Sequence, residues 1–60
     1  MKYNKAKAKY NMDFNQGHFY RGKIYNYRYD QKEDKIFVLM EEAIEQDFLC
    51  SDFNILFFLI

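Results

Sequence analysis

KAKAKYNMDF, the stretch at residues 5–14, alternates between polar and apolar side chains without a break. One parity holds Ala6, Ala8, Tyr10, Met12 and Phe14, and the other holds Lys5, Lys7, Lys9, Asn11 and Asp13. A period of two places alternate side chains on opposite faces of a β-strand, whereas a helix would scatter the same apolar positions around its axis. We therefore expect one strand over residues 5–14, with Tyr10, Met12 and Phe14 in a core and the lysines in water.

Two more strands are predicted in the central part of the chain, each bounded by turn-forming residues. Residues 15–18 and Gly22 are expected to form bends, since glycine adopts backbone conformations that other residues avoid. Residues 23–29 alternate and place three tyrosines on one face. After a polar break at 30–34, typical of a hairpin connection, residues 35–40 are apolar at both parities. A strand with two apolar faces is expected to be central in its sheet or covered on both sides.

The last third of the chain is predicted to contain a hairpin, a helical turn and a final strand. Residues 41–47, EEAIEQD, suit either a helical turn or an acidic hairpin connection. The hairpin is favoured, because few apolar side chains would hold an isolated helix in place, and a strand is expected over 47–50. Ser51 is the expected N-cap of a single 3₁₀ turn, and residues 57–60 are expected to form a strand. The pattern predicts an all-β fold.

The composition supplies an aromatic core and excludes several kinds of site. Seven Phe and six Tyr occur among 60 residues, half of which are hydrophobic. A chain this short buries only about 60% of the surface that it exposes when unfolded, so dense packing has to compensate, and one domain over residues 1–60 is expected. Cys50 has no second cysteine to pair with, and His18 alone provides too few ligands for zinc. No disulfide, metal or cofactor is expected.

Neither a membrane segment nor a secretory signal is predicted. The apolar run at 55–60 is far shorter than the ~20 residues that cross a bilayer. The basic residues within 1–9 are not followed by the apolar segment of a signal peptide. These features, together with the single cysteine, predict a soluble, cytoplasmic protein that binds no membrane.

The second half of the chain resembles the SH3 fold pattern. The resemblance is carried by GKIYNY at 22–27, by the run at 35–41, and by FLCSDFNILFFLI at 48–60, where a helical turn precedes the last strand. It implies a small five-stranded SH3-like barrel with a short 3₁₀ turn before the last strand. The chain has no Trp and no Pro, so recognition of Pro-rich peptides is not implied. What remains is similar to the small SH3-like barrels that bacteriophages and prophages encode.

The formal net charge is zero, yet the charges are segregated along the sequence. Residues 1–28 hold seven Lys or Arg against one Asp, which gives +6, and residues 29–60 hold two Lys against eight Asp or Glu, which gives −6. Such a division bears on partners and association rather than on the fold. Association between copies of the chain stays open, because a domain of this size gains stability from it.

Two candidate binding faces follow from the charged and aromatic residues. The face proposed for a protein partner comprises Tyr20, Arg21, Lys23, Tyr25, Tyr27, Arg28, Tyr29, Glu41, Glu42 and Glu45. Tyr and Arg often dominate the binding energy of protein interfaces. The alternative face, for nucleic acid, comprises Lys5, Lys7 and Lys9, which a strand would space by roughly 6.5 to 7 Å, near the spacing of phosphates. A simpler interpretation is an edge strand that lysines protect from aggregation, with the tyrosines in the core.

No catalytic site is predicted. His18 and Cys50 are a possible base and nucleophile, but a loop histidine and a small buried hydrophobe are the simpler interpretation, since no third orienting residue is recognisable. Glu41, Glu42, Glu45 and Asp47 lack the spacing of a calcium loop and are interpreted as a solvated acidic hairpin. The carboxylates also suit imitation of nucleic-acid phosphates toward a basic partner.

The favoured hypothesis is a phage-encoded binding protein, not an enzyme, that inhibits or modulates a host protein of antiviral defence or of nucleic-acid metabolism. One alternative is a nucleic-acid-binding module that uses the lysine strand. Another is a virion structural or assembly protein, which would form a defined oligomer.

Overall fold

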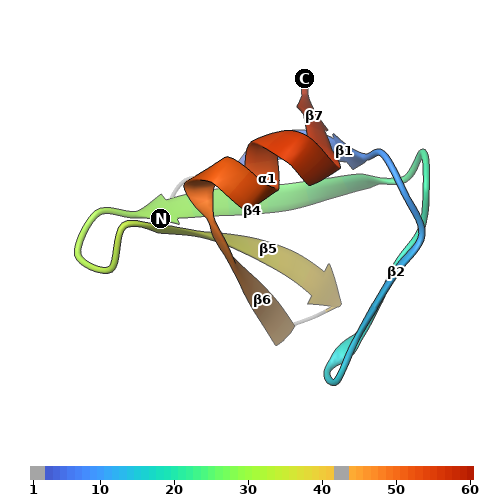
Figure 1. Cartoon of the computed structure of the whole chain (residues 1–60), viewed down its shortest axis with the longest axis horizontal. Helices are drawn as coiled ribbons and strands as arrows, with labels where there is room; N and C mark the ends of the chain where they lie inside the picture. Colours follow the sequence, from blue (N-terminus) through green and yellow to red (C-terminus); the bar gives the residue numbers. More distant parts are fainter. Residues whose placement is uncertain (1–2, 42–43) are drawn as a thin grey trace.

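A computed structural model of the chain describes residues 3–41 and 44–60 (Figure 1). Its elements are β1 (Asn4–Ala8), β2 (Met12–Phe14), β3 (Gly17–Phe19), β4 (Ile24–Asp30), β5 (Lys35–Glu41), β6 (Ile44–Leu49), α1 (Cys50–Leu56) and β7 (Phe57–Leu59). The fold is mostly β, as the alternating patterns predict. The closure of the sheet, the length of the N-terminal strand, the bounds of β6 and the helical segment differ from the sequence-based expectation.

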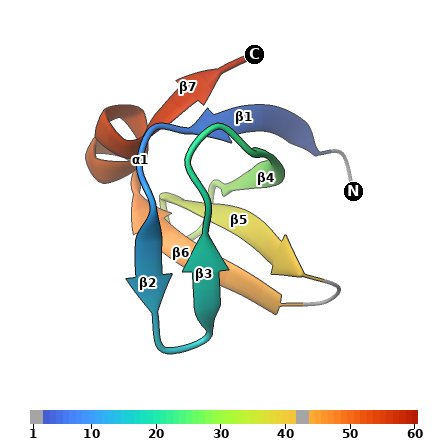
Figure 2. The same ribbon diagram turned by 90° about the vertical axis from the view of Figure 1, so that its right-hand side faces the viewer.

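Five strands form one antiparallel sheet in the order β6-β5-β4-β1-β7, and β2 and β3 form a separate hairpin (Figure 2). The last strand, β7, therefore lies beside the first, β1. In the part of the chain that the structure describes, β6 and β7 each pair with one neighbour only, so the sheet is open rather than a closed five-stranded barrel.

The N-terminal strand is shorter than predicted, because the chain bends after Ala8. Ala6 and Ala8 are buried, as the alternation predicts. Beyond them, the Lys9 N–H donates to the carbonyl oxygen of Leu56 at 2.9 Å, and regular pairing with β4 stops. The bend turns Tyr10 out of the pattern, whereas Met12 and Phe14, of the same parity, pack against the core as predicted. Tyr10 is consequently 54% exposed, and its prediction as a core residue is wrong.

The two predicted hairpins are present. Between β4 and β5, the Asp30 carboxylate accepts hydrogen bonds from the backbone N–H groups of Lys32 and Glu33, a common way to fix a turn. β5 lies between β4 and β6, which confirms that the strand is central in the sheet. Val38 is fully buried on one face, whereas Phe37 and Leu39 on the other face are half-buried. For the acidic segment the sequence favours a hairpin over a helical turn, and β5 and β6 pair as antiparallel strands. β6 runs over 44–49 instead of the expected 47–50.

The helical segment is longer than the predicted 3₁₀ turn. It forms a seven-residue α-helix, α1, which includes Cys50. Leu49 occupies the N-cap position and makes no side-chain capping bond, so the assignment of Ser51 as N-cap is wrong. Phe53, buried inside α1, stacks on Phe57 of β7 with ring centroids 4.9 Å apart. This packing explains the longer helix, since it places an apolar side chain on the sheet.

The core is aromatic, as the composition predicts. The Phe19 ring lies 4.8 to 5.9 Å, between centroids, from the rings of Phe14, Tyr25, Phe48 and Phe57. The β2–β3 hairpin thus covers the inner face of the sheet with Phe14 and Phe19 (Figure 2). Buried residues of the described chain are all apolar or aromatic.

Candidate basic binding surface

Four basic residues belong to two segments that meet where β4 begins. The Ala8 N–H donates to the Lys23 carbonyl at 3.1 Å, and the Gly22 N–H donates to the Ala8 carbonyl at 2.9 Å. These bonds fix the turn before β4 against the end of β1. The turn and the end of β1 together carry Lys7, Lys9, Arg21 and Lys23, which we call the basic corner.

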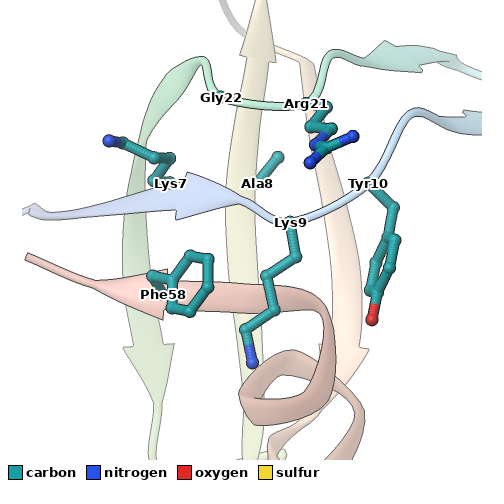
Figure 3. Close-up of a pocket in the computed structure, with 7 residues that line it drawn as sticks. All are labelled: Lys7, Ala8, Lys9, Tyr10, Arg21, Gly22 and Phe58. Atoms are coloured by element: carbon teal, nitrogen blue, oxygen red, sulfur yellow. The ribbon is translucent and has the colours of Figure 1, made fainter.

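A pocket of about 270 Å³ lies within the basic corner (Figure 3). It is lined by Lys7, Ala8, Lys9, Tyr10, Arg21, Gly22 and Phe58. Three of these side chains are cations, two are aromatic rings, and Ala8 and Gly22 leave space between them. The pocket is large enough for one side chain or one phosphate group, and its lining favours an anion.

Aromatic rings position the lysines of the basic corner. The Lys9 Nζ lies 4.6 Å from the centroid of the Phe58 ring (Figure 3). The Lys23 Nζ lies 5.6 Å from the Tyr25 centroid and 6.0 Å from that of Tyr20. A cation over a ring face is attracted by the quadrupole of the ring and keeps its full charge. The rings therefore hold the ammonium groups without neutralising them.

Carboxylates of the described residues form ion pairs elsewhere, away from the basic corner. The pairs are Arg28–Asp30, Arg28–Glu45 and Lys35–Asp47, while the Asp13 carboxylate contacts the His18 ring. Clustered charges of one sign raise the local concentration and the association rate of a ligand of opposite sign. The basic corner is thus suited to attract anions.

β4 joins the basic corner to a turn of mixed charge. It begins at the basic corner and ends at Asp30, and the turn to β5 carries Glu33 and Asp34 together with Lys32. Because β5 is antiparallel to β4, the Glu41 end of β5 lies toward the end of the sheet where β4 begins. The charge segregation of the sequence therefore does not become a separation between the two ends of β4.

The structure divides the residues predicted to bind a protein. Tyr20 is 56% exposed, and it lies with Arg21 and Lys23 at the basic corner. Tyr25 is 4% exposed and accepts a hydrogen bond from the Tyr20 N–H, so its expected place on a binding face is wrong. The alternation points its ring inward, opposite Ala6 of β1. Tyr27 is half-buried against Phe53.

The remaining predicted residues lie away from the basic corner. Arg28 and Glu45 form hydrogen bonds with each other. The Arg28 guanidinium lowers the pKa of the Glu45 carboxyl below its ordinary value of 4.5. Tyr29 is exposed at the opposite end of β4, and its hydroxyl donates to Asp34 at 2.6 Å, which raises the pKa of Tyr29. The Glu41 side chain and Glu42 lie outside the described residues.

The three lysines predicted to bind nucleic acid are not equivalent. Lys5 and Lys7 are exposed on the outer face of β1, and the Lys5 Nζ donates to Asn26 Oδ1 at 3.4 Å. Lys9 follows the end of β1 and is half-buried beside Phe58. Only Lys7 and Lys9 reach the pocket, where they meet Arg21.

Two residues of the pocket, Tyr10 and Phe58, were missed as candidates. The alternation predicts Tyr10 in the core, but the bend after Ala8 leaves its side chain exposed. Phe58 belongs to a run of apolar residues, and it faces outward because it lies opposite Lys7, whereas Phe57 lies opposite Ala8. The sequence shows that β7 is apolar but not which of its faces is buried.

No arrangement for catalysis or metal binding is evident in residues 3–41 and 44–60. The His18 ring contacts Asp13 across the β2–β3 hairpin, while the Cys50 Sγ lies 3.8 Å from the Asp34 carbonyl oxygen. Groups of three or more potential metal ligands do not occur among these residues. None of the helices described is long and apolar enough to cross a membrane.

Comparison with protein-family models, with curated proteins and with solved structures gives no match. The charge and shape of the basic corner are therefore the basis for a functional assignment.

Proposed function

We propose that the protein is a non-catalytic binding protein, and that its basic corner binds an acidic surface of another protein. The observation that carries this proposal is the pocket, where Lys7, Lys9 and Arg21 meet without a carboxylate among the described residues that line it. With a phage as the source, which the sequence resemblance suggests, the partner is a host protein that the chain inhibits or modulates.

An SH3-like arrangement belongs to the same proposal. The strand order β6-β5-β4-β1-β7 supports it, because β7 returns to pair with β1 after a helical segment. The β2–β3 hairpin occupies the long connection between β1 and β4. This connection forms one wall of the basic corner, so the proposed surface is a consequence of the topology.

Exposed apolar residues beside the pocket favour a protein partner. Phe58 is 55% exposed, and Ile24, which lies across Lys7 from it on the same face, is 49% exposed. Ile60, which has the same parity as Phe58, is also exposed. Binding of a protein partner is favoured when it removes aliphatic side chains from water. Unpaired bases bind chiefly by stacking on aromatic rings and by contacts to their phosphates.

Single-stranded nucleic acid is a second candidate partner, on a different observation. Lys5 and Lys7 project from the same face of β1, and exposed rings at Tyr20 and Phe58 lie near this strand or its neighbouring turn. Lysines contact phosphates and rings stack on bases in such complexes. The logarithm of the binding constant would fall linearly with the logarithm of salt concentration, with a slope set by the number of phosphates contacted.

The test is affinity capture from a nuclease-treated bacterial lysate with three baits: wild-type protein, Arg21→Glu and Lys32→Glu. Both substitutions reverse one exposed cation in a turn, but Lys32 lies at the opposite end of β4. We expect a stoichiometric protein on wild type and on Lys32→Glu, and its loss on Arg21→Glu. A protein retained equally by all three baits overturns the proposed surface. Recovery of nucleic acid alone, from a lysate without nuclease, favours the second candidate and overturns the first.

A further inference from the structure

The turn at residues 20–23 is held in place by its own backbone N–H groups. The Tyr20 N–H donates to the Tyr25 hydroxyl at 2.8 Å, and the Lys23 N–H donates to the Tyr20 carbonyl oxygen at 3.1 Å. The Gly22 N–H donates to the carbonyl oxygen of the last residue of β1 at 2.9 Å. Because Tyr25 is itself buried in the core, the turn is fixed to the body of the sheet.

The remaining N–H group of the turn, that of Arg21, donates to the Asn11 Oδ1 at 2.8 Å. Asn11 directly follows Lys9 and Tyr10, which line the pocket from the segment after β1. Arg21 and Gly22 line it from the turn (Figure 3). The bond between Arg21 and Asn11 therefore fixes the position of Arg21 relative to Lys9 and Tyr10.

Several backbone donors of the pocket residues are used within the molecule. The N–H groups of Ala8 and Lys9 donate to the carbonyl oxygens of Lys23 and Leu56. The two pocket residues of the turn also donate their N–H groups internally, as described above. An anion in the pocket consequently meets the cationic side chains rather than these N–H groups.

Arg21 offers a different contact from the lysines of the basic corner. The ammonium groups of Lys9 and Lys23 lie over aromatic rings. No hydrogen bond, ion pair or ring contact from the described residues engages the Arg21 guanidinium. A guanidinium presents a planar fork of N–H donors that matches the two oxygens of a carboxylate. Arg21 thus provides the directional contact, and the lysines add attraction by charge.

The rings beside the cations suit an anionic side chain with an apolar stem. Phe58 is 55% exposed and Tyr10 is 54% exposed, and both line the pocket. A glutamate side chain has one methylene group more than an aspartate, and each methylene that leaves water on binding favours the complex. Glutamate is therefore the acidic residue that best uses both the rings and the guanidinium.

We propose that the pocket receives one glutamate side chain of the acidic partner, whose carboxylate is held by both arms of the Arg21 guanidinium, and that Asn11 positions Arg21 for this contact. The inference rests on the proposed function, to which it adds the side chain that is recognised and the residue that orients the recognising group. Asn11 acts through the Arg21 backbone, because its side-chain oxygen is the acceptor of the Arg21 N–H. A group that is ordered before binding loses less entropy when the partner arrives.

Titration calorimetry of the wild-type protein with a poly-glutamate peptide and a poly-aspartate peptide of equal length tests the pocket. The two peptides carry the same charge, so attraction by charge alone gives equal affinities. We expect poly-glutamate to bind about fourfold more tightly, the factor that one further buried methylene supplies. Equal affinities, or tighter binding of poly-aspartate, overturn the inference and leave the proposed function standing. Absence of binding by both peptides contradicts the proposed function as well.

Arg21→Lys and Asn11→Ala test the two residues separately. Arg21→Lys keeps the charge and loses the fork, so it should weaken poly-glutamate binding roughly 3- to 10-fold. Asn11→Ala keeps every cation and should weaken binding roughly 2- to 10-fold, since Arg21 must then be ordered during binding. Asn15→Ala, which removes an exposed asparagine from the β2–β3 turn, is the matched control and should bind as wild type does. Wild-type affinity in either test variant would contradict the role given to that residue.

The double variant Asn11→Ala/Arg21→Lys shows whether Asn11 acts through Arg21. In that case the combined loss of affinity should be smaller than the product of the two separate losses. A general structural role does not depend on the fork of Arg21 and gives a loss equal to the product. That result, with each variant shown to be folded by circular dichroism, would overturn the positioning role of Asn11.

Discussion

Arg28 Nε and Nη2 each donate a hydrogen bond of 2.9 Å to the Glu45 carboxylate, one to each oxygen. The two residues belong to β4 and β6, which are not neighbours in the sheet, so the pair spans β5. The guanidinium lies over the Phe37 ring of β5, 4.4 Å from its centroid. Two residues predicted from the sequence to bind a partner thus connect three strands of the sheet.

Replacing Arg28 with lysine should lower the free energy of unfolding. A lysine cannot form the two parallel bonds of a guanidinium, and it fits less well over the Phe37 ring. Urea denaturation should show a lower midpoint for Arg28→Lys than for wild type. Arg21→Lys, a change to an exposed arginine, is the control and should leave the midpoint unchanged. Equal midpoints for all three proteins would show that the Arg28–Glu45 pair does not stabilise the fold.

Stability should fall in acid because of Glu45 and Asp47. Hydrogen bonds from Arg28 and from Lys35, respectively, hold the pKa values of these carboxyls below their ordinary values of 4.5 and 3.8. A lowered pKa in the folded state contributes stability above the pKa of the unfolded chain and loses it as the pH falls through the folded pKa. Urea midpoints should therefore decline below about pH 4.5. Glu45→Gln should make the decline shallower, and an unchanged slope would contradict the assignment.

Truncation of Phe53 should cost much more folding stability than truncation of Phe58, although the two residues lie only five positions apart. Phe53 is 2% exposed and stacks on Phe57, so Phe53→Ala should cost about 3–5 kcal/mol, comparable to the whole stability of a domain this small. Phe58 is 55% exposed, so Phe58→Ala should cost less than about 1 kcal/mol. Circular dichroism should show Phe53→Ala largely unfolded and Phe58→Ala folded. A folded, stable Phe53→Ala would contradict the described core.

Gly22 should tolerate asparagine better than alanine. Its φ of 83° lies in the left-handed region, and a Cβ there would meet no atom within 4 Å. The cost of Gly22→Ala is therefore that of the backbone conformation, roughly 1–2 kcal/mol, and Asn adopts this region more readily. The midpoint of thermal unfolding should be highest for wild type, lower for Gly22→Asn and lowest for Gly22→Ala. An alanine variant as stable as wild type would contradict the turn that forms the basic corner.

The strand content and the aromatic core were predictable because they depend on local alternation and composition. Ala6 and Ala8 are buried, and Val38 lies on a central strand, as their patterns indicate. Tyr10 could not be placed correctly, since its exposure depends on hydrogen bonds from distant residues that bend the chain after Ala8. The length of α1 likewise depends on the contact of Phe53 with the sheet.

The basic corner was only partly predictable. Lys7, Lys9, Arg21 and Lys23 belong to the basic half of the sequence, and each was among the predicted candidates. The meeting of Lys7, Lys9 and Arg21 at one pocket requires the bond between Gly22 and Ala8, which joins two segments that are not adjacent in sequence. The neutralisation of Glu45 by Arg28 had no sequence signal either, because it spans β5.

The most direct measurement of binding at the basic corner is an NMR titration of the backbone amides with a poly-glutamate peptide. We predict chemical-shift changes confined to residues 7–10 and 21–23, abolished by Arg21→Glu and retained by Lys32→Glu. Changes centred instead on the turn at residues 31–34, or changes of equal size in the Arg21→Glu variant, would contradict the assignment of this pocket as the site that attracts an acidic partner.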